Sequence, residues 1–299
     1  MVEDELITEA GSDPYAGYES RPTSELVELM NAEDSSVPEA VRAAAASISE
    51  AIDAIAERLR AGGRLVYVGA GSSGLIAALD ASECEATFST PPGLVVALVA
   101  GDSDTAPVAR AAAEDDRDAG ARDLTALGIR TDDAVVGISA SGSTPYVAGA
   151  LETAATAGAL TACVVCAPGS VLGGLADHEI VVVVGPEFIT GSTRLKAGTA
   201  QKLVLNAIST VTMIRLGKTY GNLMVDVVAA NEKLVERVRR IVAAATGATP
   251  HEIDDALSAA GGDARVAIVS LAANVDADMA RARLDASGRS IAKALEETQ

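Results

Sequence analysis

Two short segments rich in glycine and serine each follow an apolar run and precede a helical pattern. The first is Gly69–Gly74, with the sequence GAGSSG, and the second is Ser139–Thr144, with the sequence SASGST. Hydroxyl groups, backbone N–H groups and helix N-termini all favour a bound phosphoryl group. If both segments follow neighbouring parallel strands, they meet at the sheet edge where ligands of such sheets bind. The sequence therefore predicts a site for one compact phosphate, with candidate contacts from Ser72, Ser73, Gly74, Ser139, Ser141, Gly142, Ser143 and Thr144.

The first segment also matches the G-x-G-x-x-G fingerprint of dinucleotide-binding folds. That fingerprint requires an acidic residue about 20 positions further on, at the end of the second strand, to hold the ribose. The nearest candidate after that strand, Asp102, lies well beyond this distance. A monophosphorylated small molecule is therefore a better prediction than a dinucleotide. The alternative for either segment alone is that glycine and serine simply form a tight turn.

A third segment, Gly191–Thr199, places two cations and several hydroxyls just before a long helical pattern. Arg194 and Lys196 are candidates to hold the negative charge of a ligand, and Ser192 and the preceding Glu187 complete the candidate binding set. The alternative is that the two cations pair with surface carboxylates.

The elements that would position these segments follow from five short apolar runs, which alternate with mostly helical, alanine-rich stretches. The runs are residues 64–69, 94–100, 134–138, 160–166 and 180–184. Continuous apolar strands separated by helices indicate a parallel sheet that is covered on both faces. The predicted fold class is α/β, with a doubly wound five-stranded parallel sheet flanked by helices.

We expect three regions along the chain. Residues 1–35 form an arm and a short helix, residues 36–245 the α/β domain, and residues 246–299 a small helical domain. Within them we expect helices from Thr23 or Ser24 to Met30, from about Ser36 to Arg60, from Gly198 to near Gly217, and over 228–244. Thr249, Pro250 and Glu252 have the spacing of a capping box at the start of a further helix.

Composition limits the possible partners. The chain has 42 acidic and 23 basic residues, a net charge of −19 and 2% aromatic residues. No basic stripe is available to neutralise nucleic-acid phosphates, so a nucleic-acid binder is not expected. An acidic chain poor in lysine and in aromatic residues is typical of a salt-rich cytoplasm.

The cysteines and the chain start point to the cytoplasm as well. Cys84, Cys163 and Cys166 are an odd number without framework spacing, which indicates a reducing compartment. The chain begins with Glu3, Asp4 and Glu5 where a signal peptide would have basic residues. The uncharged stretch 153–176 is interrupted by proline and glycine, so we expect a buried strand and a turn there and no membrane span.

At these residues the chain resembles the N-acetylmuramic acid 6-phosphate etherases, which belong to the sugar isomerase domain superfamily. The resemblance runs nearly end to end and is carried by segments that include Val66–Gly71, Leu79–Cys84, Gly191–Lys202 and Tyr220–Val227. It implies the sugar isomerase fold, no metal and no cofactor, and a homodimer whose sites lie near the subunit interface. It also implies cleavage of the D-lactyl ether of N-acetylmuramic acid 6-phosphate to N-acetylglucosamine 6-phosphate and D-lactate.

The two catalytic carboxylates of that family correspond to Glu83 and Glu114. By this resemblance Glu83 is the acid for the departing lactate and Glu114 is the base at carbon 2, and water then adds to the unsaturated aldehyde. Two carboxyl groups in unlike environments can hold opposite protonation states near neutral pH, as such a reaction requires. The alternative for Glu83 is an ordinary helix-surface residue, and for Glu114, beside Asp115 and Asp116, a solvated acidic face.

The chain departs from the family at two positions that usually carry arginine, where it has Leu75 and Ser143. Losing a charge-assisted partner of a phosphate or carboxylate costs about 1.5–3 kcal/mol each. Either Arg194, Lys196 and Lys202 compensate, or the substrate differs. The alternatives are therefore a lyase or isomerase acting on another sugar phosphate, and a non-catalytic sugar-phosphate sensor.

Overall fold

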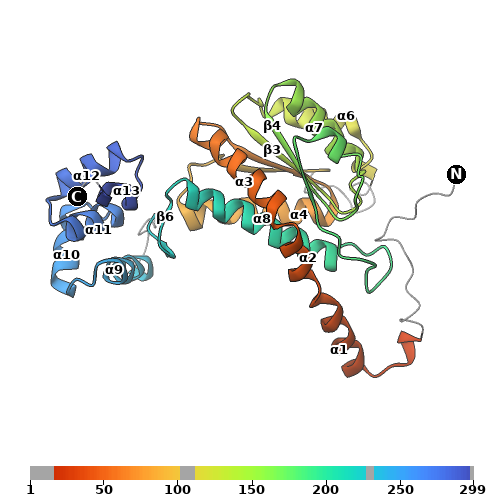
Figure 1. Cartoon of the computed structure of the whole chain (residues 1–299), viewed down its shortest axis with the longest axis horizontal. Coiled ribbons are helices and arrows are strands. Elements are labelled where there is room, and N and C mark those ends of the chain that lie inside the picture. Colours follow the sequence, from red (N-terminus) through yellow and green to blue (C-terminus); the bar gives the residue numbers. More distant parts are fainter. Residues whose placement is uncertain (1–16, 102–111, 227–231, 297–299) are drawn as a thin grey trace. The chain divides into compact units, whose positions relative to one another are not determined.

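The computed structural model describes residues 17–101, 112–226 and 232–296. A sheet of five parallel strands has the order β2-β1-β3-β4-β5, and its neighbouring strands β3 and β4 are labelled in Figure 1. The strands are β1 (Leu65–Gly69), β2 (Val95–Val99), β3 (Ala134–Ser139), β4 (Leu160–Val165) and β5 (His178–Val181). The predicted parallel sheet is confirmed, and β5 alone is clearly displaced, because it begins at His178 and ends at Val181 where residues 180–184 were expected.

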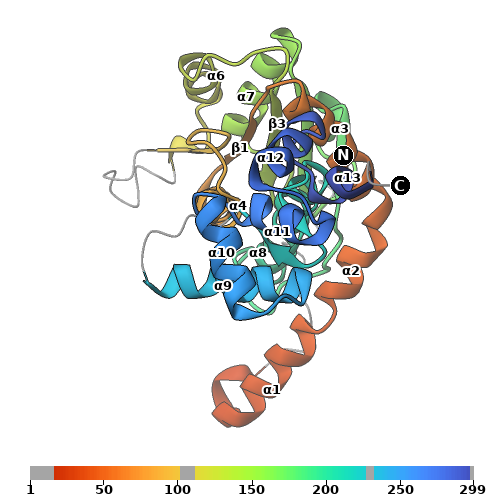
Figure 2. The ribbon, with the colours of Figure 1, turned by 90° about the vertical axis from the view of Figure 1, so that its left-hand side faces the viewer.

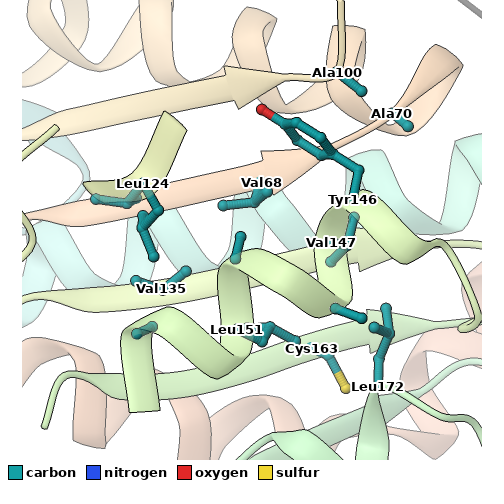
Figure 3. Close-up of a cluster of buried hydrophobic side chains, with 14 of the residues drawn as sticks. Val68, Ala70, Ala100, Leu124, Val135, Tyr146, Val147, Leu151, Cys163 and Leu172 are labelled. Carbon is teal, nitrogen blue, oxygen red and sulfur yellow. The ribbon is translucent and has the colours of Figure 1, made fainter. Parts of the chain in front are cut away.

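The two faces of the sheet are covered by different helices. Val68 and Val135 lie with Leu151 of α7 (Pro145–Thr156) in one buried cluster, which Figure 3 shows between that helix and the strands. Tyr67, between Val66 and Val68, points to the other face because side chains alternate along a strand. Its hydroxyl donates to Asp80 of α4 (Gly71–Phe88) at 3.0 Å.

Helix α6 (Arg117–Ala126) packs on α7 at backbone distance. A Cβ atom on Gly120 would lie 1.9 Å from the carbonyl oxygen of Tyr146, and one on Gly149 would lie 2.0 Å from that of Arg117. Only glycine fits at these two positions. The contact fixes the segment that precedes α6 relative to the start of α7.

The N-terminal helices follow the prediction with two differences. After a 3₁₀ turn, η3 (Tyr18–Ser20), helix α1 (Thr23–Asp34) runs beyond the expected end at Met30. The helix expected from Ser36 to Arg60 is divided into α2 (Val37–Ala43) and α3 (Ala45–Arg60) at Ala44, whose ψ of 7° is not helical. Helix α3 has an apolar face of Ile48, Ile52, Ile55 and Leu59, all buried.

Helix α8 (Lys196–Arg215) confirms the long helix, although it begins before Gly198. A 3₁₀ turn, η4 (Gly173–Leu175), precedes β5, and a two-stranded antiparallel hairpin of β6 (Thr219–Tyr220) and β7 (Leu223–Met224) follows α8.

The C-terminal helices pack around α11, which is apolar and largely buried. They are α9 (Glu232–Thr246), α10 (Pro250–Ala259), α11 (Ala264–Ala273), α12 (Ala277–Ala286) and α13 (Ile291–Glu296), and Figure 2 shows them from the side. The capping box at α10 is confirmed, since Glu252 accepts the N–H of Thr249 and Thr249 accepts that of Glu252. The expected start of α9 at residue 228 lies outside the described residues.

Contacts divide the chain into two compact units. The first holds residues 1–82 and 93–209, and the second holds residues 83–92 and 210–299. The sequence grouped residues 210–245 with the α/β domain, whereas the division by contacts assigns residues 210–299 to the second unit. Within the described part of the chain no single helix has both the length and the apolar composition to cross a membrane. Only α10 and α11 together meet those limits, and the chain bends by 119° between them.

Candidate active site

A cavity of about 420 Å³ lies in the first unit, at the carboxyl ends of β1 and β3. The two serine-rich loops and part of the third segment meet there. The predicted site residues that line the cavity are Ser72, Ser73, Glu114, Ser139, Ser141, Ser143 and Thr144. The segments that the sequence placed at one sheet edge therefore share one cavity.

The loop after β3 is held by hydrogen bonds between its own hydroxyl groups. Ser139 Oγ lies 2.8 Å from Thr144 Oγ1 and accepts the N–H of Gly142 at 3.0 Å. Ser141 Oγ lies 3.0 Å from Ser143 Oγ. Gly142 has a φ of 71°, and a Cβ there would come within 2.4 Å of Ser170, so it shapes the loop without lining the cavity.

The loop after β1 turns sharply into α4. Gly74 packs against Gly69, and a Cβ on Gly74 would lie 2.8 Å from the carbonyl oxygen of Gly69. Gly74 is thus a packing position of the turn and does not line the cavity. Ser73 donates from Oγ to Gln201 Oε1 of α8 at 2.9 Å.

Glu114 is held next to the second loop through its backbone. Its carbonyl oxygen accepts the N–H of Tyr146, in the first turn of α7, at 3.0 Å. Two residues later Asp116 caps α6 by accepting the N–H of Ala119 at 2.8 Å, and this hydrogen bond holds the pKa of the Asp116 carboxyl below its usual value. Glu114 is exposed and lines the cavity together with Asp115. The backbone is fixed while the carboxylate stays available to a ligand.

The third segment contributes Gly191 and Thr193 to the lining, while Ser192 and Arg194 do not reach it. Lys196 is buried, and its Nζ lies 2.6 Å from Glu33 Oε2 of α1. Glu187 is buried too and accepts the N–H groups of Lys196 and Ala197, both at 2.9 Å. A carboxylate at that place satisfies the free N–H groups of the α8 N-terminus. In this structure both side chains hold elements together, and a contact with ligand stays a prediction for them.

The described lining holds two carboxylates and no lysine or arginine. Leu75, at one of the positions where arginine was expected, is 56% exposed, and Ser143 contributes only a hydroxyl. Lys202 is exposed and lies outside the lining. Within the described residues, an anion in this cavity meets hydroxyls, backbone N–H groups and the N-termini of α4 and α7.

Glu83 is also exposed but does not line the cavity. It lies on α4, eleven residues beyond Ser72. At the rise of an α-helix this separation is about 16 Å along the axis. Its segment, 83–92, belongs to the second unit, where Ser89 donates to the backbone oxygen of Asp226.

The sequence did not identify Asp115, Gly191, Thr193 or Gln201 as part of the site or its support. The position of Asp115 next to Glu114 could have pointed to it. The other three lie inside Gly191–Lys202, one of the segments that carry the family resemblance, and that resemblance could have pointed to them. In the described ranges no group of three or more histidine, cysteine or acidic side chains is placed to hold a metal ion.

Comparison with known proteins gives consistent matches. Residues 47–155 match the model of the glucokinase regulatory protein N-terminal SIS domain, and residues 112–211 match that of the SIS domain. A solved structure from Listeria monocytogenes, assigned as a sugar-phosphate isomerase, has a TM-score of 0.50 at 16% identity. The match covers 67% of this chain and 95% of that one. At such identity it supports the fold alone.

The matches to curated proteins are much closer. The chain is 56% identical over 282 residues to the N-acetylmuramic acid 6-phosphate etherase of Rubrobacter xylanophilus, which covers 94% of each chain. It is 53% identical over 290 residues to the protein of the same name from Streptomyces avermitilis, covering 97% of this chain and 93% of that one.

Proposed function

The chain belongs to the N-acetylmuramic acid 6-phosphate etherase family, and we propose that it cleaves the D-lactyl ether of N-acetylmuramic acid 6-phosphate. The products are N-acetylglucosamine 6-phosphate and D-lactate. The observation that carries the proposal is one cavity that joins two hydroxyl-rich loops to the carboxylate of Glu114.

The phosphate of the substrate is assigned to the two loops. Ser72 and Ser73 stand at the start of α4, and Ser143 and Thr144 at the start of α7. The N-terminal ends of both helices, and with them the positive ends of their dipoles, lie at the cavity. Such a site suits a compact dianion, and Glu114 then lies where the sugar would extend.

In the proposed reaction the sugar is in its open aldehyde form. Glu114 removes the proton from carbon 2, the bond from carbon 3 to the ether oxygen breaks, and a double bond forms between carbons 2 and 3. Glu83 protonates the departing oxygen, which gives D-lactate. Water then adds its hydroxyl to carbon 3 and a proton returns to carbon 2, so that the net change is hydrolysis of the ether.

We infer that a second copy of the chain supplies Glu83. Along α4 it is about 16 Å from Ser72, further than a glutamate side chain reaches. Glu83 shares one face of α4 with Leu75 and Leu79, which are 56% and 55% exposed. An apolar face beside a required carboxylate fits burial by a second copy in a homodimer.

The first experiment offers N-acetylmuramic acid 6-phosphate to the purified protein and measures released D-lactate, in parallel at low and molar salt. We expect turnover that leaves solvent deuterium at carbon 2 of the product when the reaction runs in D₂O. Absence of lactate from folded protein under both conditions would contradict the proposal.

A mixing experiment tests the shared site. Glu83→Gln and Glu114→Gln are each expected to be inactive, and mixed dimers contain one site with both glutamates intact. Random exchange of subunits then restores about a quarter of the parental activity. A mixture that remains as inactive as its components would show that both glutamates come from the same chain.

A different sugar phosphate is the second candidate, and the lack of lysine and arginine in the described lining favours testing it. Deuterium incorporated at carbon 2 of another sugar phosphate, without lactate release, would identify a related lyase or isomerase. Binding without any exchange would identify a sensor. A cytoplasmic location belongs to the proposal as well, and it is consistent with three buried cysteines that form no disulfide among the described residues.

A further inference from the structure

Gln201 is a buried side chain of α8 that reaches a hydroxyl of the cavity. It is 1% exposed, and its Oε1 accepts the Oγ–H of Ser73 at 2.9 Å. No described residue accepts a hydrogen bond from its Nε2, which is fully buried. A buried amide nitrogen without a partner is unfavourable, so its presence next to a cavity hydroxyl calls for a physical reason.

The direction of this hydrogen bond decides what Ser73 offers to a ligand. A serine hydroxyl has one proton and two lone pairs. While the proton is donated to Gln201, Ser73 presents only lone pairs to the cavity, and these repel a phosphate oxygen. A half-turn of the Gln201 amide reverses the bond, because Nε2 then donates to Ser73 Oγ and the hydroxyl proton becomes available to the phosphate.

Among the described residues the Gln201 amide is held in its present orientation by the single hydrogen bond to Ser73, because its Nε2 has no acceptor. In the opposite orientation Nε2 would donate to Ser73 Oγ, so the two orientations differ in where the Ser73 proton points. A phosphate in the cavity interacts favourably with only one of them. A ligand shifts such an equilibrium through this difference in interaction.

We propose that Gln201 is a positioning residue. By rotating its amide it stops accepting the Ser73 hydroxyl proton and donates to Ser73 Oγ instead, so that the hydroxyl can donate its proton to the phosphate. The inference rests on the proposed function of the cavity as a phosphate site. It assigns a role to a residue that does not itself line the cavity.

Binding of inorganic phosphate and of N-acetylglucosamine 6-phosphate, measured by calorimetry on the full chain, tests the role. Gln201→Glu can only accept from Ser73 while ionised, and we expect the Kd to rise about tenfold to a hundredfold. Gln201→Met releases the hydroxyl to rotate freely, and we expect a rise of about threefold to tenfold. Thr212→Val is the matched control, since it removes a different polar group of α8, a hydroxyl that is also buried and lacks a partner among the described residues.

A double-mutant comparison separates positioning from a general packing effect. In a Ser73→Ala background, Gln201→Met should change the Kd by no more than about twofold, because the group it acts through is gone. An equal effect in both backgrounds would overturn the inference while leaving the phosphate site intact. Phosphate binding that is absent, or independent of Ser73, would overturn the site and the inference together.

The wild-type protein provides a measurement that does not depend on variants that fold. The two side-chain amide protons of Gln201, assigned through the backbone by NMR, should shift during a phosphate titration with the same Kd as the calorimetry. Amide protons that stay unchanged at saturating phosphate would contradict the proposed rotation.

Discussion

The two edges of the central sheet use polar groups in opposite ways. At the amino end, Asp133 is completely buried and accepts from the N–H of Arg64 at 2.8 Å, from Nη2 of Arg64 at 2.6 Å and from the N–H of Arg130 at 2.9 Å. Nearby, Asp177 accepts both the N–H and the hydroxyl of Thr161 at 2.9 Å. The charge of Asp133 is matched by Arg64 here, and both carboxylates hold the starts of strands in place.

At the carboxyl end, neutral hydroxyls bind mainly one another, and the described cavity lining has no cation. Its donors stay partly exposed and can turn toward a ligand. The difference separates interactions that stabilise the fold from groups that remain able to bind a ligand. Matched charges at the amino end stabilise the fold, and incompletely satisfied donors at the carboxyl end keep binding capacity for an anion.

The largest effect is expected from Glu114→Gln, which removes the proposed base without changing shape. The kcat for lactate release should fall about a hundredfold to ten-thousandfold, as is usual for the loss of a general base. The free energy of unfolding should hardly change, since the side chain is exposed. Parental kcat in this variant would remove Glu114 from the mechanism.

Asp133→Asn probes the opposite edge and should act on stability instead. Breaking a buried, charge-paired carboxylate should lower the free energy of unfolding by about 2–4 kcal/mol. Urea titration measures this, with the exposed neighbour Asp132→Asn as control. The KM of the folded variant should equal that of the parent, and a changed KM with unchanged stability would reverse the comparison.

The same residue predicts a pH dependence with a definite sign. Burial raises the pKa of Asp133, but the hydrogen bonds from Arg64 and Arg130 outweigh it and hold the pKa below its usual range. A lowered pKa stabilises the fold above the unfolded value, near 4, and this contribution disappears as the pH falls through the folded value. The difference in unfolding free energy between the parent and Asp133→Asn should therefore shrink from pH 7 to pH 3. A constant difference would contradict it.

The sequence predicted the strands and the two loops because their signals are local. A buried parallel strand is a continuous apolar run, and Ser139–Thr144 has to turn at its end. Contacts such as Lys196 with Glu33, or Ser73 with Gln201, join residues more than a hundred positions apart. Their partners depend on how helices pack, which no local pattern encodes. The break between α2 and α3 at Ala44 was not predicted either, because the helical pattern of the sequence runs through it without interruption.

Ser143→Arg sharpens the comparison by adding a cation to the edge whose described cavity lining has none. In dilute buffer the added cation should lower the KM for the sugar phosphate roughly tenfold, the amount of one charge-assisted hydrogen bond. Because salt screens exposed charges, this gain should largely disappear at molar KCl, while the parental KM changes little. A parental KM with the same steep salt dependence would show that cations already act at this site.

The smallest effect concerns the cysteines of the sheet. Burial raises the pKa of Cys163 and of Cys166 to about 12 in each case. Alkylation by iodoacetamide at pH 8 should therefore be slow and should follow global unfolding, because the thiolate is the reactive form. Rapid labelling of the native protein would indicate that this part of the sheet opens locally.

The central claim is that the carboxyl-end cavity binds the phosphate of the substrate beside Glu114. A crystal structure with N-acetylglucosamine 6-phosphate tests it most directly. We expect the phosphate between the loops of Ser72–Ser73 and Ser139–Thr144, with carbon 2 of the sugar within reach of the Glu114 carboxylate. A ligand bound elsewhere, or one whose phosphate points away from both loops, would contradict the account.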